Sequence, residues 1–183
     1  SEGKWFVVFR GDPGTSKTFS ARTFGATAGF DHVVEVGCLK DMEARDFIAG
    51  PAVLGDGGNG YLYVDGPLAK AWRLAAVGKK VCIILDEIGN VPRGAKQAFQ
   101  TATSPDMNEN LTLSTGRAIV PKKGDPYIEE ITAPMANISI IGTQNIGPKF
   151  DCPPDSPAFK ARFKPFHVKT SEKLIRDIVG QRV

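Results

Sequence analysis

Long hydrophobic runs are missing from this sequence of 183 residues, and no apolar stretch approaches the roughly 20 residues that cross a membrane. The N-terminal residues lead directly into a short strand-like run, so we see no secretory signal peptide. The absence of a membrane span and of a secretory signal predicts a cytoplasmic location. The length fits one domain of ordinary size with a hydrophobic core of its own.

Cysteine and histidine are also scarce, with three and two residues respectively. The cysteines, Cys38, Cys82 and Cys152, form no C-x-x-C pair, which argues against a zinc site or a disulfide framework and for a reducing compartment. His32 and His167 have no partner at metal-ligand spacing, so we expect both to be structural. The sequence therefore gives no reason to expect a metal site built from thiolates or imidazoles.

Charge of one sign is in only slight excess, because the net charge is +3 and the basic residues are spread along the chain. They are denser over residues 160–173, where we expect a solvated surface rather than a nucleic-acid site. The charge balance is thus only a weak indication of a nucleic-acid partner.

The chain does contain short apolar strands that alternate with helical stretches, which is typical of an α/β fold with a mostly parallel sheet. Five strands are predicted, at residues 5–10, 33–36, 81–85, 138–142 and 166–168. Helices are predicted at residues 17–28, 39–47, 67–77 and 93–103, from near residue 156, and from residue 171. We expect residues 1–170 to form one α/β core, followed by a terminal helix at residues 171–183.

Two stretches interrupt the alternation. Glycines surround the strand-like residues 61–64, which predicts a hairpin-like insertion, because glycine supplies the positive backbone angles of turns. Residues 111–120 and 127–132 predict a second hairpin, with its turn at residues 122–125. Both hairpins are insertions into the predicted α/β core.

The segment GDPGTSKT, Gly11 to Thr18, follows the first strand and is similar to a phosphate-binding loop, with Ser16 where the standard pattern has glycine. Backbone N–H groups and a helix N-terminus would cradle phosphate oxygens, Lys17 would reach the β- and γ-phosphates, and Thr18 would ligate magnesium. Provided that the backbone of Ser16 stays right-handed, no glycine is needed there. The expected nucleotide contacts are Asp12, Pro13, Gly14, Thr15, Ser16, Lys17 and Thr18.

Polar residues also end two later strands. Asp86 and Glu87 follow the strand at 81–85, and Asn145 follows the strand at 138–142. In a parallel sheet the carboxyl ends of the strands share one edge, so we expect these residues to lie beside the loop. Asp86 would hold magnesium, Glu87 would activate water as a general base, and Asn145 would position the water or the γ-phosphate. The alternatives are surface carboxylates at a loop start and a turn asparagine.

In this order, these residues resemble the AAA+ ATPases, and within them the MoxR-like, dynein-related branch. GDPGTSKT resembles that branch's GPPGT-x-K-[ST], IILDEI resembles its Walker B strand, and GTQNIG resembles its sensor 1 segment with Asn145 as the sensor. SPAFKARF resembles SPALLDRF, in which the arginine reaches the nucleotide of a neighbouring subunit, and this maps onto Arg162. DGPLAKAW resembles the helix that follows the family's helix-2 insertion.

The resemblance implies a three-layer P-loop sandwich with a helix-2 insertion and a pre-sensor hairpin. It also implies a hexameric homo-oligomer that hydrolyses ATP with Mg²⁺ and remodels a protein or nucleic-acid partner, with Arg162 acting in trans. Residues 171–183 are too few for the family's helical lid, so we expect the lid to be largely absent or truncated. A salt bridge on a surface helix is the alternative role for Arg162.

Other functions stay open at this point. The stretch at residues 86–89 spells the D-x-x-G of GTPases, but no N-K-x-D motif occurs, and a small-molecule kinase fits the Asp-Glu pair less well. A nucleotide-gated assembly or DNA-binding module with little hydrolysis, such as a viral or mobile-element protein, is the other alternative. In that case Arg117, Lys122 and Lys123 would line a pore or contact DNA, although a solvated hairpin tip is the simpler interpretation.

Overall fold

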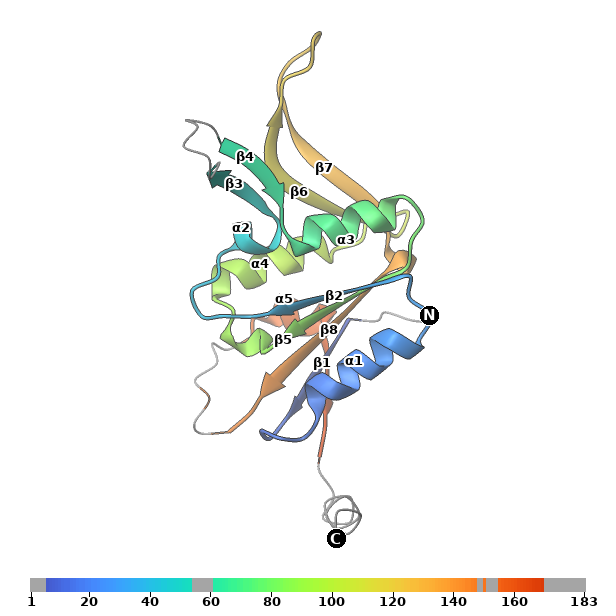
Figure 1. Cartoon of the computed structure of the whole chain (residues 1–183), viewed down its shortest axis with the longest axis vertical. Helices are drawn as coiled ribbons and strands as arrows, with labels where there is room; N and C mark the ends of the chain where they lie inside the picture. Colours follow the sequence, from blue (N-terminus) through green and yellow to red (C-terminus); the bar gives the residue numbers. More distant parts are fainter. Residues whose placement is uncertain (1–5, 54–60, 148–149, 151–154, 170–183) are drawn as a thin grey trace.

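The computed structural model describes residues 6–53, 61–147, 150 and 155–169 (Figure 1). Its centre is a five-stranded sheet in the order β2-β5-β8-β1-β9, in which every neighbouring pair is parallel. The strands are β1 (Phe6–Gly11), β2 (His32–Gly37), β5 (Val81–Asp86), β8 (Ile138–Asn145) and β9 (Lys164–His167). The predicted five-stranded parallel α/β fold is therefore confirmed.

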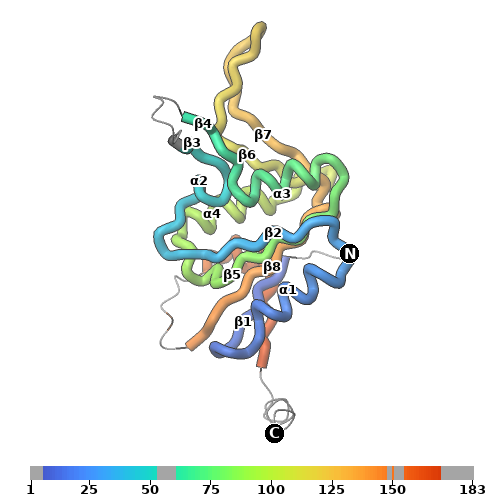
Figure 2. Tube along the Cα trace, viewed as in Figure 1, coloured from blue at the N-terminus to red at the C-terminus, as the bar shows by residue number. Residues whose placement is uncertain are grey.

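Helices cover both faces of this sheet and give three layers (Figure 2). α1 (Lys17–Thr27) lies on one face, where Ala21 packs against Cys82 and Ile84 of β5. α3 (Pro67–Ala76) and α4 (Arg93–Ala102) lie on the other, where Trp72 and Phe99 join the main core. Successive residues of β5 thus face opposite layers, which is why this central strand is an uninterrupted apolar run.

The observed bounds differ from those predicted at several elements; the strand predicted at 166–168, for example, is β9 at Lys164–His167, and two elements differ more. The helix predicted at 39–47 is confined to α2 (Ala44–Phe47), because Glu43 and Asp46 form a reciprocal capping box that fixes its first turn. The strand predicted at 138–142 continues to Asn145, and Gly11 of β1 is the register partner of Asn145. α5 (Pro157–Arg162) begins as predicted, after Ser156 accepts a hydrogen bond from the N–H of Phe159.

The edge strand β9 is tied to the end of β1. Beyond the paired residues, the N–H of Val168 donates to the carbonyl of Arg10 at 2.7 Å. A Cβ placed on Gly11 would lie 2.3 Å from the carbonyl oxygen of Val168. The backbone at Val168 therefore lies directly against Gly11, where the loop that follows β1 begins.

Both predicted hairpins are present and extend from the α3–α4 side of the sandwich (Figure 1). β3 (Ala49–Val53) pairs with β4 (Tyr61–Asp65), and β6 (Asn110–Ile119) pairs with β7 (Tyr127–Pro134), with an irregularity between Ser114 and Ala118. Short 3-10 turns, η1 (Ile88–Asn90) and η2 (Met135–Asn137), follow β5 and β7.

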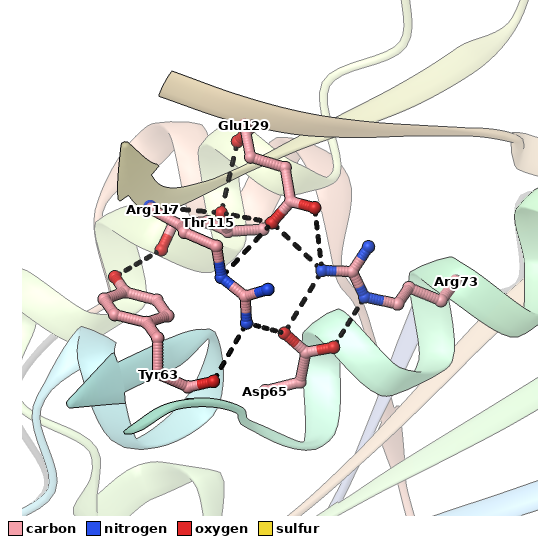
Figure 3. A network of polar contacts seen from close by, with 6 residues as sticks. All are labelled: Tyr63, Asp65, Arg73, Thr115, Arg117 and Glu129. Atoms are coloured by element: carbon pink, nitrogen blue, oxygen red, sulfur yellow. Dashed lines mark hydrogen bonds and ion pairs between the residues drawn. The ribbon is translucent and has the colours of Figure 1, made fainter. Parts of the chain in front are cut away.

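A group of four charged side chains, which we call the hairpin ion cluster, joins the two hairpins to α3 (Figure 3). It consists of Asp65, Arg73, Arg117 and Glu129. Arg73 lies 2.5 Å from Asp65 and 3.0 Å from Glu129, and Arg117 lies 3.3 Å from Asp65. The hydrogen bond from Arg73 holds the pKa of Asp65 below its ordinary value.

Arg117 is thus engaged with acidic side chains and does not lie at a solvated hairpin tip. Its guanidinium also donates to the carbonyl of Tyr63, and the Tyr63 hydroxyl donates to the carbonyl of Thr115 at 2.9 Å. Lys122 and Lys123 are exposed in the turn between β6 and β7. Arg117, Lys122 and Lys123 were considered together as residues that would line a pore or contact DNA. Arg117 lies in an ion cluster, whereas the two lysines are exposed to solvent.

Cys38 and Cys82 are buried, and burial raises the pKa of their thiols to about 12 and about 11. Cys152 and the predicted helix at 171–183 lie outside the described residues. Within the described ranges, no helix is long and apolar enough to cross a membrane.

Candidate nucleotide-binding site

The loop after β1 and the polar ends of β5 and β8 meet at one edge of the sheet, as the sequence predicted. They border a pocket of about 250 Å³, which we call the strand-end pocket. Its lining residues are Pro13, Gly14, Ser16, Lys17, Thr18, Phe19, Glu87 and Asn145. Both predicted catalytic strand-end residues, Glu87 and Asn145, thus share a pocket with the loop lysine, whereas Asp86, the predicted magnesium ligand, is not among the lining residues.

Lys17 is buried, and its ammonium group folds back onto the loop. It donates to the carbonyls of Gly11 and Asp12, at 3.1 and 2.7 Å, and to the hydroxyl of Thr15 at 3.1 Å. Burial lowers the pKa of Lys17, and the nearby carboxylates oppose that shift. The loop therefore holds a cation whose hydrogen bonds go to neutral oxygens of its own backbone and of one hydroxyl.

Ser16 does not have the right-handed backbone on which its tolerance was argued. Its φ and ψ are 58° and 24°, in the left-handed region, at the N-cap of α1. The condition on which serine was expected to be tolerated is therefore not met, because the turn into the helix has a positive φ at this position. A non-glycine residue there costs roughly 1–2 kcal/mol, which the loop sustains.

Thr18 and Asp86 present oxygen atoms next to each other. The hydroxyl of Thr18 donates to Oδ1 of Asp86 at 2.6 Å. Hydroxyl and carboxylate oxygens suit Mg²⁺, which takes few protein ligands and keeps waters or substrate phosphates in its remaining positions. No cluster of three His, Cys, Asp or Glu side chains that could hold a metal occurs among the described residues. The pair therefore fits the predicted magnesium ligands.

Glu87 and Asn145 are directly hydrogen-bonded, from the side-chain amide nitrogen of Asn145 to Oε1 of Glu87. Burial raises the pKa of Glu87, which the hydrogen bond from Asn145 and the charge of Lys17 oppose. Asn145 lies within β8 and not in a turn, so the alternative of a turn asparagine is wrong. The arrangement places a carboxylate of raised proton affinity beside an amide at the mouth of the pocket.

Arg162, the last residue of α5, lies apart from the strand-end pocket of its own chain. Its guanidinium donates to the Ser104 hydroxyl at 3.0 and 2.7 Å and to the carbonyl of Ala158 at 3.0 Å. Within the part of the chain that the structure describes, no carboxylate pairs with it in a salt bridge. Its predicted action on a neighbouring subunit stays a prediction.

Sequence reasoning missed two groups of residues at this edge. Lys96 of α4 is buried and forms an ion pair of 3.0 Å with Asp155, which also pairs with Arg10. A lysine on an amphipathic helix gives no sequence signal of burial. Thr143 of β8 hydrogen-bonds to Asp86 and to the backbone of Glu87. The sequence did contain a signal for Thr143, because this residue directly precedes Gln144 and Asn145 after an apolar run.

A parallel sheet with a phosphate-binding loop after one strand, and an acidic pair after another strand of the same edge, defines a P-loop α/β nucleotide-binding domain. The model of the AAA domain family, dynein-related subfamily, matches residues 7–163, and the chain belongs to this family. This membership supports nucleotide binding and ATPase activity in general. The predicted resemblance to the AAA+ ATPases is confirmed.

A solved structure shares the fold. A protein from Cytophaga hutchinsonii, provisionally named an ATPase, superposes with a TM-score of 0.58 at 18% sequence identity, over 98% of this chain and 46% of its own. The chain thus spans less than half the length of that protein, and the likeness bears on the fold alone. Among curated protein sequences, none matches this chain.

Proposed function

We propose that this chain is the core of a magnesium-dependent ATPase, which binds ATP in the strand-end pocket and hydrolyses it to remodel a partner. One observation carries the proposal: a buried lysine, the Thr18 hydroxyl and a carboxylate–amide pair line a single pocket, and the Thr18 hydroxyl is hydrogen-bonded to Asp86. P-loop hydrolases need these three groups to hold phosphates, to hold magnesium and to activate water.

The loop residues divide the binding work. Lys17 leaves the carbonyls of Gly11 and Asp12 and neutralises the β- and γ-phosphates, while backbone N–H groups at the start of α1 cradle them. Thr18 and Asp86 would hold Mg²⁺, which would supply positive charge to neutralise the phosphates. Asp12, Pro13, Gly14, Thr15 and Ser16 complete the proposed contacts of the loop.

Glu87 and Asn145 serve the chemical step. Glu87 accepts a proton from the attacking water, and its raised pKa increases its proton affinity. Asn145, which donates a hydrogen bond to the Glu87 carboxylate, is proposed to orient this carboxylate and the attacking water. Arg162 of a neighbouring subunit is proposed to stabilise the transition state, where an arginine supplied in trans can accelerate hydrolysis about a thousandfold or more.

Ring assembly, magnesium dependence and the client follow from the same proposal. The hexamer is supported by family membership and by the position of Arg162 outside its own pocket. The partner is a protein or nucleic-acid client, for which the two hairpins on the α3–α4 side are the available projections. A cytoplasmic location remains the proposal of the sequence.

Replacing Glu87 by glutamine tests the hydrolytic assignment. Glu87→Gln keeps the shape of the side chain and removes the base, so turnover should fall about 100-fold or more while ATP stays bound. Phosphate release and calorimetric ATP affinity would be measured on Glu87→Gln, on the wild type and on the control Glu35→Gln, a matched change at a residue of the edge strand β2. Unchanged turnover in Glu87→Gln would contradict the assignment, and competition by GTP would test the base preference.

A second candidate function is a nucleotide-gated assembly module with little hydrolysis. It is favoured by the bonds that the catalytic groups make to one another, since Glu87 is held by Asn145 and Lys17 by its own loop. In that case the wild type would bind ATP and assemble without measurable phosphate release. Sedimentation with and without ATP, beside a turnover assay, separates the two functions.

A further inference from the structure

We propose that Thr143 is a positioning residue of this site, whose single hydroxyl orients both members of the Asp86–Glu87 pair. The inference rests on the proposed function and adds a residue to which neither the family nor the motif comparison gives a role. It is carried by two hydrogen bonds at one buried oxygen, which link Thr143 to Asp86, the last residue of the neighbouring strand β5, and to Glu87, which follows that strand.

The geometry fixes the direction of each bond. Thr143 is 1% exposed in β8, and its Oγ1 donates to Oδ1 of Asp86 at 2.5 Å and accepts from the backbone N–H of Glu87 at 3.0 Å. A hydroxyl has one proton, so donation to the carboxylate leaves the lone pairs for the N–H. The same oxygen therefore holds the proposed magnesium ligand and the backbone of the proposed base.

Glu87 is the residue for which such a restraint matters. Its φ and ψ are 57° and 44°, so the chain turns sharply into η1 directly after β5. Left-handed backbone at a non-glycine residue persists where the surroundings hold it, and the bond to Thr143 is one such contact. The turn aims the Glu87 side chain at Asn145, two residues beyond Thr143 on β8.

Packing beneath Thr143 supports the same turn. A Cβ on Gly142 would lie 3.0 Å from Cγ2 of Ile88 and 3.2 Å from Cγ2 of Val8. The first residue of η1 is therefore seated directly on β8, one position before Thr143. The glycine admits the turn, and the threonine hydroxyl fixes its orientation.

Packing alone does not require this hydroxyl. β8 is buried from Ile138 to Gln144, and at position 143 valine would match the shape and the strand preference of threonine. A buried hydroxyl is costly unless it is hydrogen-bonded, and here both bonds go to the site. Because Thr18 also donates to Oδ1 of Asp86, Thr143 holds that oxygen at the position where the proposed magnesium ligands meet.

Two substitutions separate the hydroxyl from the shape. Thr143→Val removes the hydroxyl and keeps the branched side chain, whereas Thr143→Ser keeps the hydroxyl. Thr112→Val is the matched control, since the Thr112 hydroxyl pairs with Thr132 in the β6–β7 hairpin. Four quantities would be measured for each variant: kcat and KM for ATP, calorimetric ATP affinity over a magnesium titration, and the ligand-free Tm.

Loss of a group that orients metal ligands typically costs about 10- to 100-fold, so Thr143→Val should lower kcat by that factor with little change in KM. It should also raise the magnesium concentration at half-maximal ATP binding, while ATP affinity without magnesium is unchanged. Thr143→Ser should recover most of the loss, and Thr112→Val should behave as the wild type.

Wild-type kcat and magnesium dependence in Thr143→Val would overturn the inference. So would a Thr143→Ser variant as impaired as Thr143→Val, since shape would then be the cause, or a loss that only tracks a lowered Tm. If the wild type itself binds ATP without hydrolysing it, the proposed function fails, and the magnesium titration still decides the role of Thr143.

Discussion

The strand-end pocket and the hairpin ion cluster are two polar networks of one small domain, and they balance charge differently. Three carboxylates act on the charge of Lys17, those of Glu87, which lines the pocket, and of Asp12 and Asp86 nearby. In the hairpin ion cluster two arginines face two carboxylates. The carboxylates around Lys17 therefore outnumber it, and a bound cation would offset the difference, whereas the charges within the hairpin ion cluster balance.

The hydrogen bonds and ion pairs of the two networks also differ in whether a ligand can replace them. Groups in the pocket hydrogen-bond to neighbours beside an open volume of about 250 Å³, so a ligand can replace those bonds. Groups in the hairpin ion cluster join β4, β6 and β7 to α3 across about fifty residues of sequence. The first network is suited to exchange partners, and the second to hold two hairpins in one orientation.

The largest effect that would test this contrast is expected from Lys17. Lys17→Met removes the one cation among the described residues that line the pocket and should weaken ATP binding about 30-fold or more, since a lost charge contact of this kind costs at least about 2 kcal/mol. Calorimetric titration would measure it, with the exposed Lys79→Met as the matched control. Undiminished ATP affinity in Lys17→Met would remove the loop from the binding site.

A smaller effect, on stability only, is expected from the hairpin ion cluster. Arg73→Met leaves two carboxylates without their main partner and should lower the free energy of unfolding by about 1 kcal/mol, because Arg73 is partly exposed. ATP affinity should be unchanged. Denaturant titration measures the first quantity and calorimetry the second; a change in ATP affinity would show that the two networks are coupled.

The difference in the free energy of unfolding between the wild type and Arg73→Met should depend on pH because of Asp65. Its pKa in the folded state is lowered from the ordinary value of 3.8, chiefly by the hydrogen bond from Arg73. The folded state then binds fewer protons than the unfolded state, so the stabilisation is present above pH 3.8 and is lost as pH falls through the lowered value. Wild type and Arg73→Met should thus approach equal stability in acid.

The smallest effect is expected from Ser16. Ser16→Gly relieves roughly 1–2 kcal/mol of backbone strain and loses about 0.5–1 kcal/mol to the entropy of glycine, so the domain should gain about 0.5–1 kcal/mol. Ser20→Gly, inside α1, should instead destabilise the domain by about 0.5 kcal/mol. A thermal or denaturant series in which both variants lose stability would contradict the strain assigned to Ser16.

The sequence predicted those features that depend on local pattern. The apolar runs of β5 and β8 and the spacing of the loop were enough to place Lys17, Asp86 and Asn145 at one edge. The end of β8 was missed because its last residues are polar, although they pair with β1 in the sheet. Residues 143–145 are polar because they lie at the candidate site, and their polarity does not mark the end of the strand.

Features that depend on distant contacts were out of reach. Arg117 was grouped with Lys122 and Lys123 by proximity in sequence, but its partner Asp65 lies 52 residues away. The left-handed backbone of Ser16 is likewise set by the geometry of the loop and not by the residue's preference. Pairings across the fold, and strain imposed by it, leave no periodic signal in the residues themselves.

The crossing of Val168 over Gly11 limits how the edge of this sheet can change. Position 16 accepts a side chain at the expense of strain, but position 11 has no room for one, because the carbonyl of Val168 would lie 2.3 Å from a Cβ there. Sliding β9 by one residue along β1 would present a different backbone group to the loop. The contact of Val168 with Gly11 therefore restricts the register of β9 against β1. An engineered connection after residue 168 must preserve this register to keep the conformation of the loop.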